Sequence, residues 1–178
     1  MTEQLDREYR TQRLLLRPFT SADVDADFAY ASSPSYGEFL NLPQPFERRH
    51  SEERIARCLN DDWSKEPSFA IVLDGSVIGT LSVRIDNANW ANLGYGLSYG
   101  HWGKGLIVEA ARPIITDLFR RIHVARIEIS ADAPNHRSRR VAEKLGFHYE
   151  GTLRNRMIVR NQRYDDVYYG LLPNEWNG

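Results

Sequence analysis

The segment Gly94–Ala110, GYGLSYGHWGKGLIVEA, carries the strongest structural signal in the chain. Its first part is typical of a strand and its last part of a helix. Between them, Gly100, Gly103 and Gly105 allow left-handed backbone dihedrals and let backbone N–H groups approach an anion. The helix that follows adds its positive N-terminus. The segment therefore predicts either a phosphate-binding turn or an ordinary strand-to-helix turn.

The turn matches neither of two common phosphate-binding loops. A Walker loop requires glycine five positions before its Gly-Lys pair and Ser or Thr after it, where this chain has Ser98 and Gly105. A dinucleotide fingerprint that starts at Gly94 requires a third glycine at the position of Tyr99. What remains is a loop W-G-K-G-L at 102–106.

Composition and charge limit the classes of protein to consider. The chain has 178 residues, 42% hydrophobic and 26% charged, which predicts a single globular domain over residues 1–178. A formal net charge of −1 argues against nucleic acid as a partner. The polar start MTEQLDREYR and the lack of a long apolar run argue against a membrane protein. Cys58 is the only cysteine, which favours a core role in a reducing, cytoplasmic compartment. With no HxxxH pair and no cysteine cluster, no metal site is expected.

The remaining elements follow from periodicity and turn residues. In the first half we expect a strand at 11–19, a helix from 21 toward 32, a loop at 34–49, a helix opening at Ser51, a hairpin of 68–73 and 76–85 around Asp74-Gly75, a turn at 86–90 and a strand at 92–99. In the second half we expect a helix at 104–121, a strand at 125–131 parallel to its predecessor, a helix at 135–146 ending at Gly146, and strands at 147–153 and 165–172. Pro113 inside the third helix is expected to kink it or to cost about 3 kcal/mol.

Two of these segments resemble one known family. The loop at 102–106 resembles the acetyl-coenzyme A pyrophosphate loop of the GNAT N-acetyltransferase superfamily. About 30 residues later, NHRSRRVAEKLGF at 135–147 resembles the superfamily's N-x-x-S helix that ends in K-L-G-F. The ends of the chain, with RLLLRPF and YDDVYYGLLPNEW, resemble the ribosomal-protein N-terminal alanine acetyltransferases. The resemblance implies a mixed α/β fold with a twisted, mostly antiparallel sheet of about seven strands, flanked by helices and with a parallel pair splayed around the cofactor.

The resemblance also implies an activity and a cofactor site. Acetyl-CoA would donate its acetyl group to a primary amine by direct attack, without an acyl-enzyme. The strand at 94–99, including Leu97 and Tyr99, would bind the pantetheine arm, and the N–H near Leu97 would face the thioester oxygen. The pyrophosphate would lie against the turn made by Trp102, Gly103, Lys104, Gly105 and Leu106. Trp102 stands where relatives usually have Arg or Gln, and Ile107 where they usually have a small residue.

The helix at 135–146 supplies two further candidates. Asn135 is suited to cap the helix, and in the family its amide would also bind the pantetheine chain. Ser138 lies on the apolar face of the helix, where its hydroxyl would either assist the leaving thiolate or bond a helical carbonyl. Many relatives place a tyrosine for this purpose four residues later, but this chain has Ala142. That substitution assigns the thiolate role to Ser138.

The sequence does not single out a general base. Relatives often have Glu near the start of the central strand, where this chain has Asn92. Glu128 on the next strand and Asp86 in the preceding turn are the substitutes, and water alone is the third alternative. An N-terminal amine has a pKa of about 7.7–8.0, against about 10.4 for lysine, so part of it is already neutral near pH 7.

The resemblance implies that the acceptor is the N-terminus of a protein, most readily a ribosomal one. A small amine such as a polyamine, an amino acid or an antibiotic is the alternative acceptor. A non-catalytic acetyl-CoA-binding module is a further alternative. The resemblance also allows a homodimer.

Overall fold

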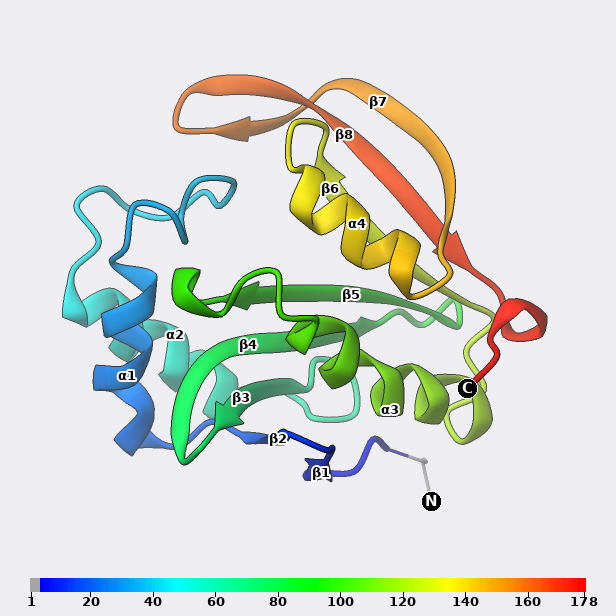
Figure 1. The fold of residues 1–178 in the computed structure, drawn as a ribbon, viewed down its shortest axis with the longest axis horizontal. Helices are drawn as coiled ribbons and strands as arrows, with labels where there is room; N and C mark the ends of the chain where they lie inside the picture. The colour runs from blue at the N-terminus through cyan, green and yellow to red at the C-terminus, as the bar shows by residue number, and fades with distance from the viewer. Residues whose placement is uncertain (1–3) are drawn as a thin grey trace.

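The computed structural model describes residues 4–178 and contains one eight-stranded sheet in the order β1-β2-β3-β4-β5-β6-β8-β7 (Figure 1). β5 and β6 are parallel, and the other neighbouring pairs are antiparallel. The strands are β1 (Tyr9–Arg10), β2 (Leu14–Pro18), β3 (Ser68–Leu73), β4 (Ser76–Ile85), β5 (Trp90–Leu97), β6 (Arg126–Asp132), β7 (His148–Val159) and β8 (Gln162–Leu171). The predicted mixed, mostly antiparallel fold is confirmed, and the two-residue β1 is the strand beyond the expected seven.

Four α-helices lie on the two faces of this sheet: α1 (Val24–Ala31), α2 (Arg48–Asn60), α3 (Leu106–Arg120) and α4 (His136–Lys144) (Figure 1). Strand β3 shows the division, because its side chains alternate between two buried clusters. Phe69 and Ile71 join the cluster that includes α3 and α4, whereas Ala70 and Val72 join the one that includes α1 and α2. Each pair of helices therefore covers one face of the sheet.

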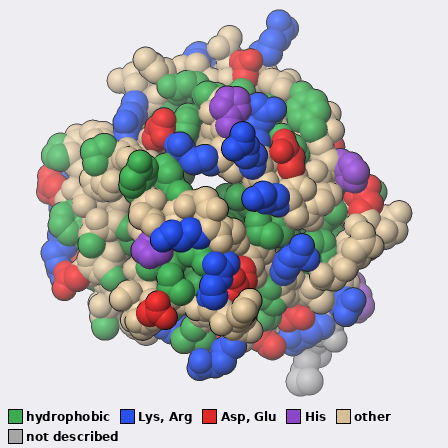
Figure 2. All heavy atoms as spheres, viewed as in Figure 1, with side chains coloured by type: hydrophobic (Ala, Val, Ile, Leu, Met, Phe, Trp, Pro, Cys, Tyr) green, Lys and Arg blue, Asp and Glu red, His purple; other side chains and the backbone are tan. Residues whose placement is uncertain are grey.

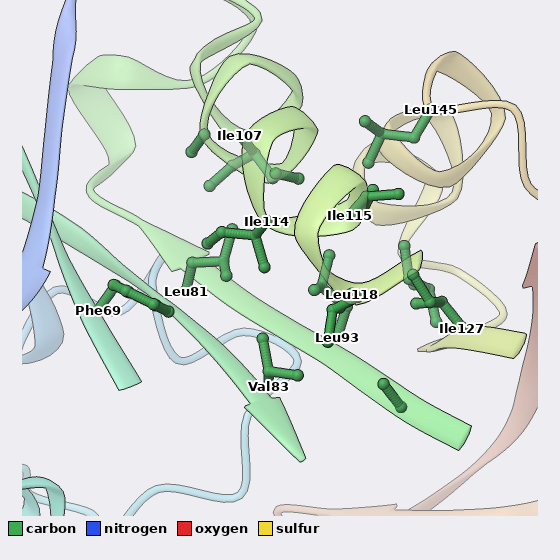
Figure 3. Packing of buried hydrophobic residues seen from close by; sticks show 14 of the residues in the cluster. Phe69, Leu81, Val83, Leu93, Ile107, Ile114, Ile115, Leu118, Ile127 and Leu145 are labelled. Atoms are coloured by element: carbon green, nitrogen blue, oxygen red, sulfur yellow. The ribbon is translucent and has the colours of Figure 1, made fainter. Parts of the chain in front are cut away.

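Helix α3 provides the main packing surface of the larger cluster (Figure 3). Ile107, Ala111, Ile114 and Leu118 lie along one helical face and are all buried, as their spacing predicts. The helix runs without interruption through Pro113, which is only partly buried. Packing along the whole apolar face holds the helix together across the position where proline removes one backbone hydrogen bond.

Several boundaries differ from the sequence-based expectations. Helix α2 starts at Arg48 rather than Ser51, because Glu47 is the N-cap residue and its backbone N–H donates to His50 Nδ1 at 2.9 Å. Strand β5 starts at Trp90 rather than 92. β7 and β8 are longer than expected and meet at Arg160 and Asn161, which have φ of 50° and 62°. This two-residue turn lacks the Asn-Gly or Asp-Gly pair that usually predicts such a hairpin.

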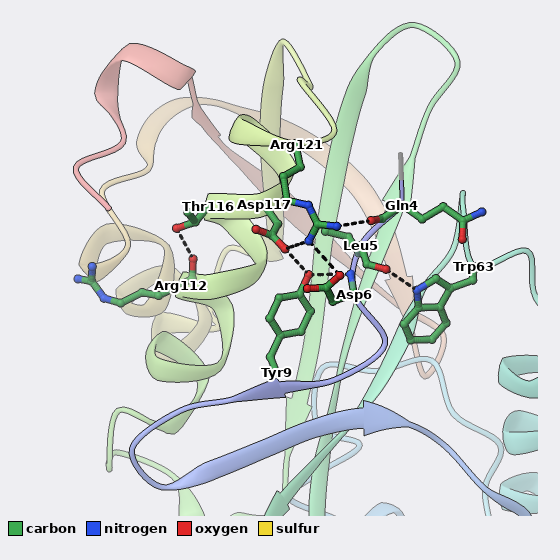
Figure 4. A network of polar contacts seen from close by, with 9 residues as sticks. All are labelled: Gln4, Leu5, Asp6, Tyr9, Trp63, Arg112, Thr116, Asp117 and Arg121. Atoms are coloured by element: carbon green, nitrogen blue, oxygen red, sulfur yellow. Dashed lines mark hydrogen bonds and ion pairs between the residues drawn. The ribbon is translucent and has the colours of Figure 1, made fainter. Parts of the chain in front are cut away.

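The N-terminal segment is fixed to the end of α3 and to the core by polar contacts (Figure 4). The Tyr9 hydroxyl donates to Asp117 Oδ2 at 2.8 Å, and Arg121 pairs with both Asp117 and Asp6. The Trp63 indole N–H donates to the carbonyl of Leu5 at 3.0 Å. Within residues 4–178, no helix is long and apolar enough to cross a membrane.

Candidate active site

Strands β5 and β6 separate soon after they begin. They pair only at Trp90–Asn92 with Arg126–Glu128, and β5 then continues for five residues without pairing to β6. The two strands are then separated by a gap. Extending the same register places Asp132, the last residue of β6, level with Gly96 of β5 across this gap. A cavity of about 520 Å³ is lined by the end of β5, the glycine turn, the start of α3 and one side of α4. The predicted splayed parallel pair is thus present, with a cavity beside it.

The glycine turn has the backbone geometry that its sequence predicts at two of three positions. Gly103 and Gly105 have φ of 75° and 74°, in the region that side chains other than glycine rarely adopt. A Cβ atom at either position would meet nothing within 4 Å, so the turn is open on that side. Gly100 instead lies in a short 3₁₀ turn, Tyr99–His101, without a positive φ. α3 begins directly after Gly105, which directs its N-terminus at the cavity.

Arg13 supports the turn from outside. Its guanidinium donates to the Lys104 carbonyl at 3.2 Å and pairs with Glu109 of α3 at 2.6 Å. Burial raises the pKa of Glu109, but hydrogen bonds from Thr11 and Arg13 outweigh it and hold this pKa below its usual value. Glu109 is therefore ionised near neutral pH and joins the N-terminal segment to the first turn of α3.

The end of β5 turns its last backbone groups toward the gap. The Ser98 N–H donates to the Ile78 carbonyl at 2.8 Å, and because such bonds alternate along an antiparallel ladder, the backbone groups of Leu97 point to the opposite edge. The Leu97 carbonyl accepts a hydrogen bond from Trp102 Nε1 at 2.6 Å. Trp102 therefore ties the glycine turn to β5.

On α4, Ser138 contacts β5 through a tyrosine that the sequence did not single out as a site residue. The hydroxyls of Tyr95 and Ser138 lie 2.9 Å apart, and Tyr95 also reaches the Ser138 carbonyl at 3.1 Å. Burial raises the pKa of Tyr95 to about 12, so its hydroxyl stays protonated near pH 7. Asn135 is the N-cap, and its Oδ1 accepts the Ser138 N–H at 3.1 Å. Its side-chain NH₂ group donates to no other group within residues 4–178.

Cationic side chains gather around the cavity. Figure 2 shows the surface hollowed near its centre, with several Lys and Arg side chains around the opening. Arg137, Arg140 and Lys144 of α4 line the cavity. The Arg137 guanidinium lies 4.2 Å from the Trp102 ring and pairs with Glu38 at 2.6 Å. Arg139 of the same helix instead contacts the Tyr169 hydroxyl and the Ala133 carbonyl and does not line the cavity.

The loop between α1 and α2 forms another wall, from Ser35, Tyr36, Phe39 and Leu40. The Tyr36 hydroxyl lies 3.3 Å from Arg54, which pairs with the fully buried Asp27. Arg160, at the tip of the β7–β8 hairpin, donates to the Gly37 carbonyl at 2.8 Å. The loop between α1 and α2 and the β7–β8 hairpin are far apart in sequence, yet they are in contact on this side of the cavity. Sequence periodicity did not predict this contact.

The structure brings most of the predicted site residues together. Leu97, Trp102, Gly103, Gly105, Leu106, Asn135 and Ser138 all line the cavity. Tyr99 and Lys104 belong to the same turn but are exposed and do not line it. Glu128 lies at the closed end, where β5 and β6 still pair, and its carboxylate is 3.0 Å from Arg126. Asp86 accepts the Ala88 N–H in the turn before β5, also away from the cavity.

These features define a class of protein. A splayed parallel pair followed by a glycine turn and an N-capped helix is the arrangement expected from the resemblance, and the model of the "Acetyltransferase (GNAT) domain" family matches residues 13–148. The chain belongs to this family and is an acetyl-CoA-dependent N-acetyltransferase.

Named relatives agree with this assignment, and a solved structure shares the fold. The chain is 38% identical over 140 residues to the "Putative ribosomal N-acetyltransferase YdaF" of Bacillus subtilis, which covers 74% of this chain and 76% of that protein. It is 34% identical over 101 residues to the ribosomal-protein-serine acetyltransferase of Escherichia coli, covering 56% of each. The structure of RimL, a ribosomal L7/L12 alpha-N-protein acetyltransferase in complex with coenzyme A, superposes with a TM-score of 0.81 at 20% identity and covers 91% of this chain and 95% of that one.

Proposed function

We propose that this protein acetylates the N-terminal α-amine of a protein, with a ribosomal protein as the first class to test. The observation that carries the proposal is the arrangement of β5 and α4 on two sides of one cavity, where the Leu97 N–H at the end of β5 and the Ser138 hydroxyl of α4 are both offered to a ligand. Acetyl-CoA supplies the activated acetyl group when it is bound there.

The residues that line the cavity fit coenzyme A. The open glycine turn and the N-terminus of α3 offer N–H groups to a pyrophosphate. Arg137, Arg140 and Lys144 provide positive charge for the phosphates. The free NH₂ group of Asn135 is available to an amide of the pantetheine chain.

The catalytic roles follow from the same contacts. The Leu97 N–H, which has no partner on β4, donates to the thioester oxygen as negative charge develops on it. The Tyr95 hydroxyl donates to the Ser138 carbonyl and lies beside the Ser138 hydroxyl, so it orients this serine, whose hydroxyl proton turns to the leaving thiolate as negative charge develops on sulfur. A thiolate whose pKa lies near 8.5 leaves readily, so one hydroxyl is sufficient help.

The charge of the cavity favours a particular kind of acceptor. Its lining includes the cationic Arg137, Arg140 and Lys144, which disfavours a polyamine with several positive charges. An α-amine carries at most one charge and is partly neutral near pH 7. The names of the relatives from Bacillus subtilis and Escherichia coli point to the same class of acceptor.

The test is mass spectrometry of a mixed pool of acceptors incubated with acetyl-CoA and the purified protein. The pool holds peptides that begin with Ala, Ser or Met, the same peptides with a blocked α-amine and one internal lysine, a polyamine and an aminoglycoside. We expect the mass of one acetyl group to be added only to peptides with a free α-amine. Acetylation of the blocked peptides or of a small amine would overturn the proposed acceptor, and no transfer to any amine would overturn the proposed function.

A further inference from the structure

Two buried carboxyl groups lie side by side at the end of the sheet next to the gap. Asp132 of β6 and Asp166 of β8 are directly opposite each other in the antiparallel register, which places their Cβ atoms about 5 Å apart. The two residues are only 5% and 2% exposed. Paired carboxyl groups with so little exposure are uncommon unless they bind a proton, a cation or both.

One of these carboxyl groups lacks a partner. The Oδ1 atom of Asp132 is buried and has no hydrogen-bond partner among residues 4–178. Burial, and then the charge of Asp166, raise the pKa of Asp132. Burial likewise raises the pKa of Asp166, opposed by Tyr168 on the same strand and Arg156 on β7. A buried carboxylate oxygen without a donor is costly, so it marks a place for a group that donates a hydrogen bond.

The position of Asp132 relates this pair to the reaction. Its neighbour Ala131 packs in the core with α3 and α4, so the Asp132 side chain points to the opposite face of the sheet. The extended register places Asp132 level with Gly96, whose missing Cβ leaves room for the Tyr36 hydroxyl on that same face. Ser138 lies on the α4 side of β5, where it bonds Tyr95. The carboxyl pair and the proposed thiolate-stabilising hydroxyl therefore lie on opposite faces of the gap.

We propose that Asp132, paired with Asp166, binds the ammonium form of the acceptor and accepts its proton before acetyl transfer. This inference rests on the proposed function, because it assumes that an amine attacks within this gap. When both carboxyl groups are ionised they repel each other, so the pair readily takes up one proton from an α-ammonium group and then shares it, with a single negative charge remaining. Their environment makes the ionised pair a stronger base than an exposed aspartate.

The protons balance in this scheme. The ammonium loses one proton to the carboxyl pair, and the neutral nitrogen then bonds to the thioester carbonyl carbon. The carbon–sulfur bond breaks with its electron pair remaining on sulfur. The second proton leaves the new amide nitrogen and protonates the thiolate by way of Ser138 and solvent, and the carboxyl pair returns its own proton to solvent.

The experiment compares two acceptors that differ only in basicity. One is a peptide that begins with glycine, and the other is the same peptide beginning with azaglycine, in which NH replaces the Cα group, so that its terminal NH₂ is a hydrazide nitrogen that is neutral at pH 7. For Asp132→Asn we expect kcat/KM to fall about 100-fold on the α-amine peptide and less than tenfold on the hydrazide. Acetyl-CoA Kd and Tm should stay near the wild-type values, because an amide replaces a carboxyl group of the same shape.

Three further variants define the controls. Asp166→Asn should also lower kcat/KM more on the α-amine peptide than on the hydrazide, but by a smaller factor than Asp132→Asn. Asp74→Asn, an exposed aspartate in the β3–β4 turn, makes the identical chemical change away from the cavity and should leave both rates unchanged. Glu128→Gln tests the competing base. If kcat/KM on the α-amine peptide falls in Glu128→Gln and not in Asp132→Asn, the proposal is overturned.

Equal losses on both acceptors would also overturn the proposal, because they indicate a structural role for Asp132. So would wild-type kcat/KM in Asp132→Asn. The proposed function is tested independently of the carboxyl pair, with the wild-type protein. It is overturned if that protein acetylates a small amine in place of peptides. The same comparison is then made on that amine and its hydrazine analogue, with the same expected difference. Transfer to no amine overturns both proposals.

Discussion

Replacing Gly96 by alanine tests whether the loop between α1 and α2 is pressed against the reaction gap. A Cβ at this position would lie 2.5 Å from the Tyr36 hydroxyl oxygen and 2.9 Å from two ring carbons. Tyr36 is 5% exposed and contacts Arg54, so its ring has little freedom to move away. Overpacking of this kind costs about 1–3 kcal/mol in the free energy of unfolding.

Gly94, two residues earlier on the same face of β5, is the matched control. A Cβ there would meet only Ser82 Oγ, at 3.0 Å, which is the end of a small side chain. Alanine also favours a strand over glycine by about 0.5–1 kcal/mol. We therefore expect Gly94→Ala to be within about 1 kcal/mol of the wild type and Gly96→Ala to be clearly destabilised.

The assay is urea unfolding of both variants, with each also made in a Tyr36→Leu background. If the clash with Tyr36 is the cause, Gly96→Ala should cost at least about 1 kcal/mol less when the tyrosine is absent, since contacting residues couple by about 0.5–3 kcal/mol. Acetyl-CoA titration should show weaker binding for Gly96→Ala, because the residue lines the cavity. Equal stability of the two single variants, or a cost of Gly96→Ala that is independent of Tyr36, would refute this reasoning.

Three further variants address separate parts of the molecule. Ser138→Ala should lower kcat about tenfold at saturating acetyl-CoA, since a hydrogen bond to a charged group is lost; unchanged turnover would exclude the thiolate role. Trp102→Phe keeps an aromatic ring but loses the 2.6 Å bond to the Leu97 carbonyl, so acetyl-CoA Kd measured by calorimetry should rise about fivefold, and an unchanged Kd would mean that the bond does not hold the turn. Asp23→Asn removes a buried carboxylate. Burial raises the pKa of Asp23, but hydrogen bonds from Arg17 and Thr20 lower this pKa by more than burial raises it. The folded pKa is thus depressed, so its contribution is present above the unfolded pKa of about 3.9 and is lost as pH falls through the folded value. Urea unfolding should show a deficit of about 2 kcal/mol at pH 7 that shrinks toward pH 3, and a constant deficit would contradict the assignment.

Features with local causes follow from the amino-acid sequence alone. Gly103 and Gly105 adopt positive φ because no other residue type does so easily, and Asn135 caps α4 because its side chain reaches the Ser138 N–H three residues on. The hairpin at Asp74-Gly75 follows from its turn residues in the same way. The resemblance of the two motifs to one family then supplied the strand order and the cofactor.

Tertiary structure alone decided which distant residues meet. Asp132 faces Asp166 because β8 pairs with β6 in one register, and a shift by one residue would turn either carboxyl group to the other face. Tyr36 reaches Gly96 only because α1 and α2 pack against the same sheet face. Local periodicity carries no information on such pairings, since they depend on which strands become neighbours. The turn and the helix cap could therefore be predicted from sequence, whereas the carboxyl pair and the wall at Tyr36 became visible only in the folded chain.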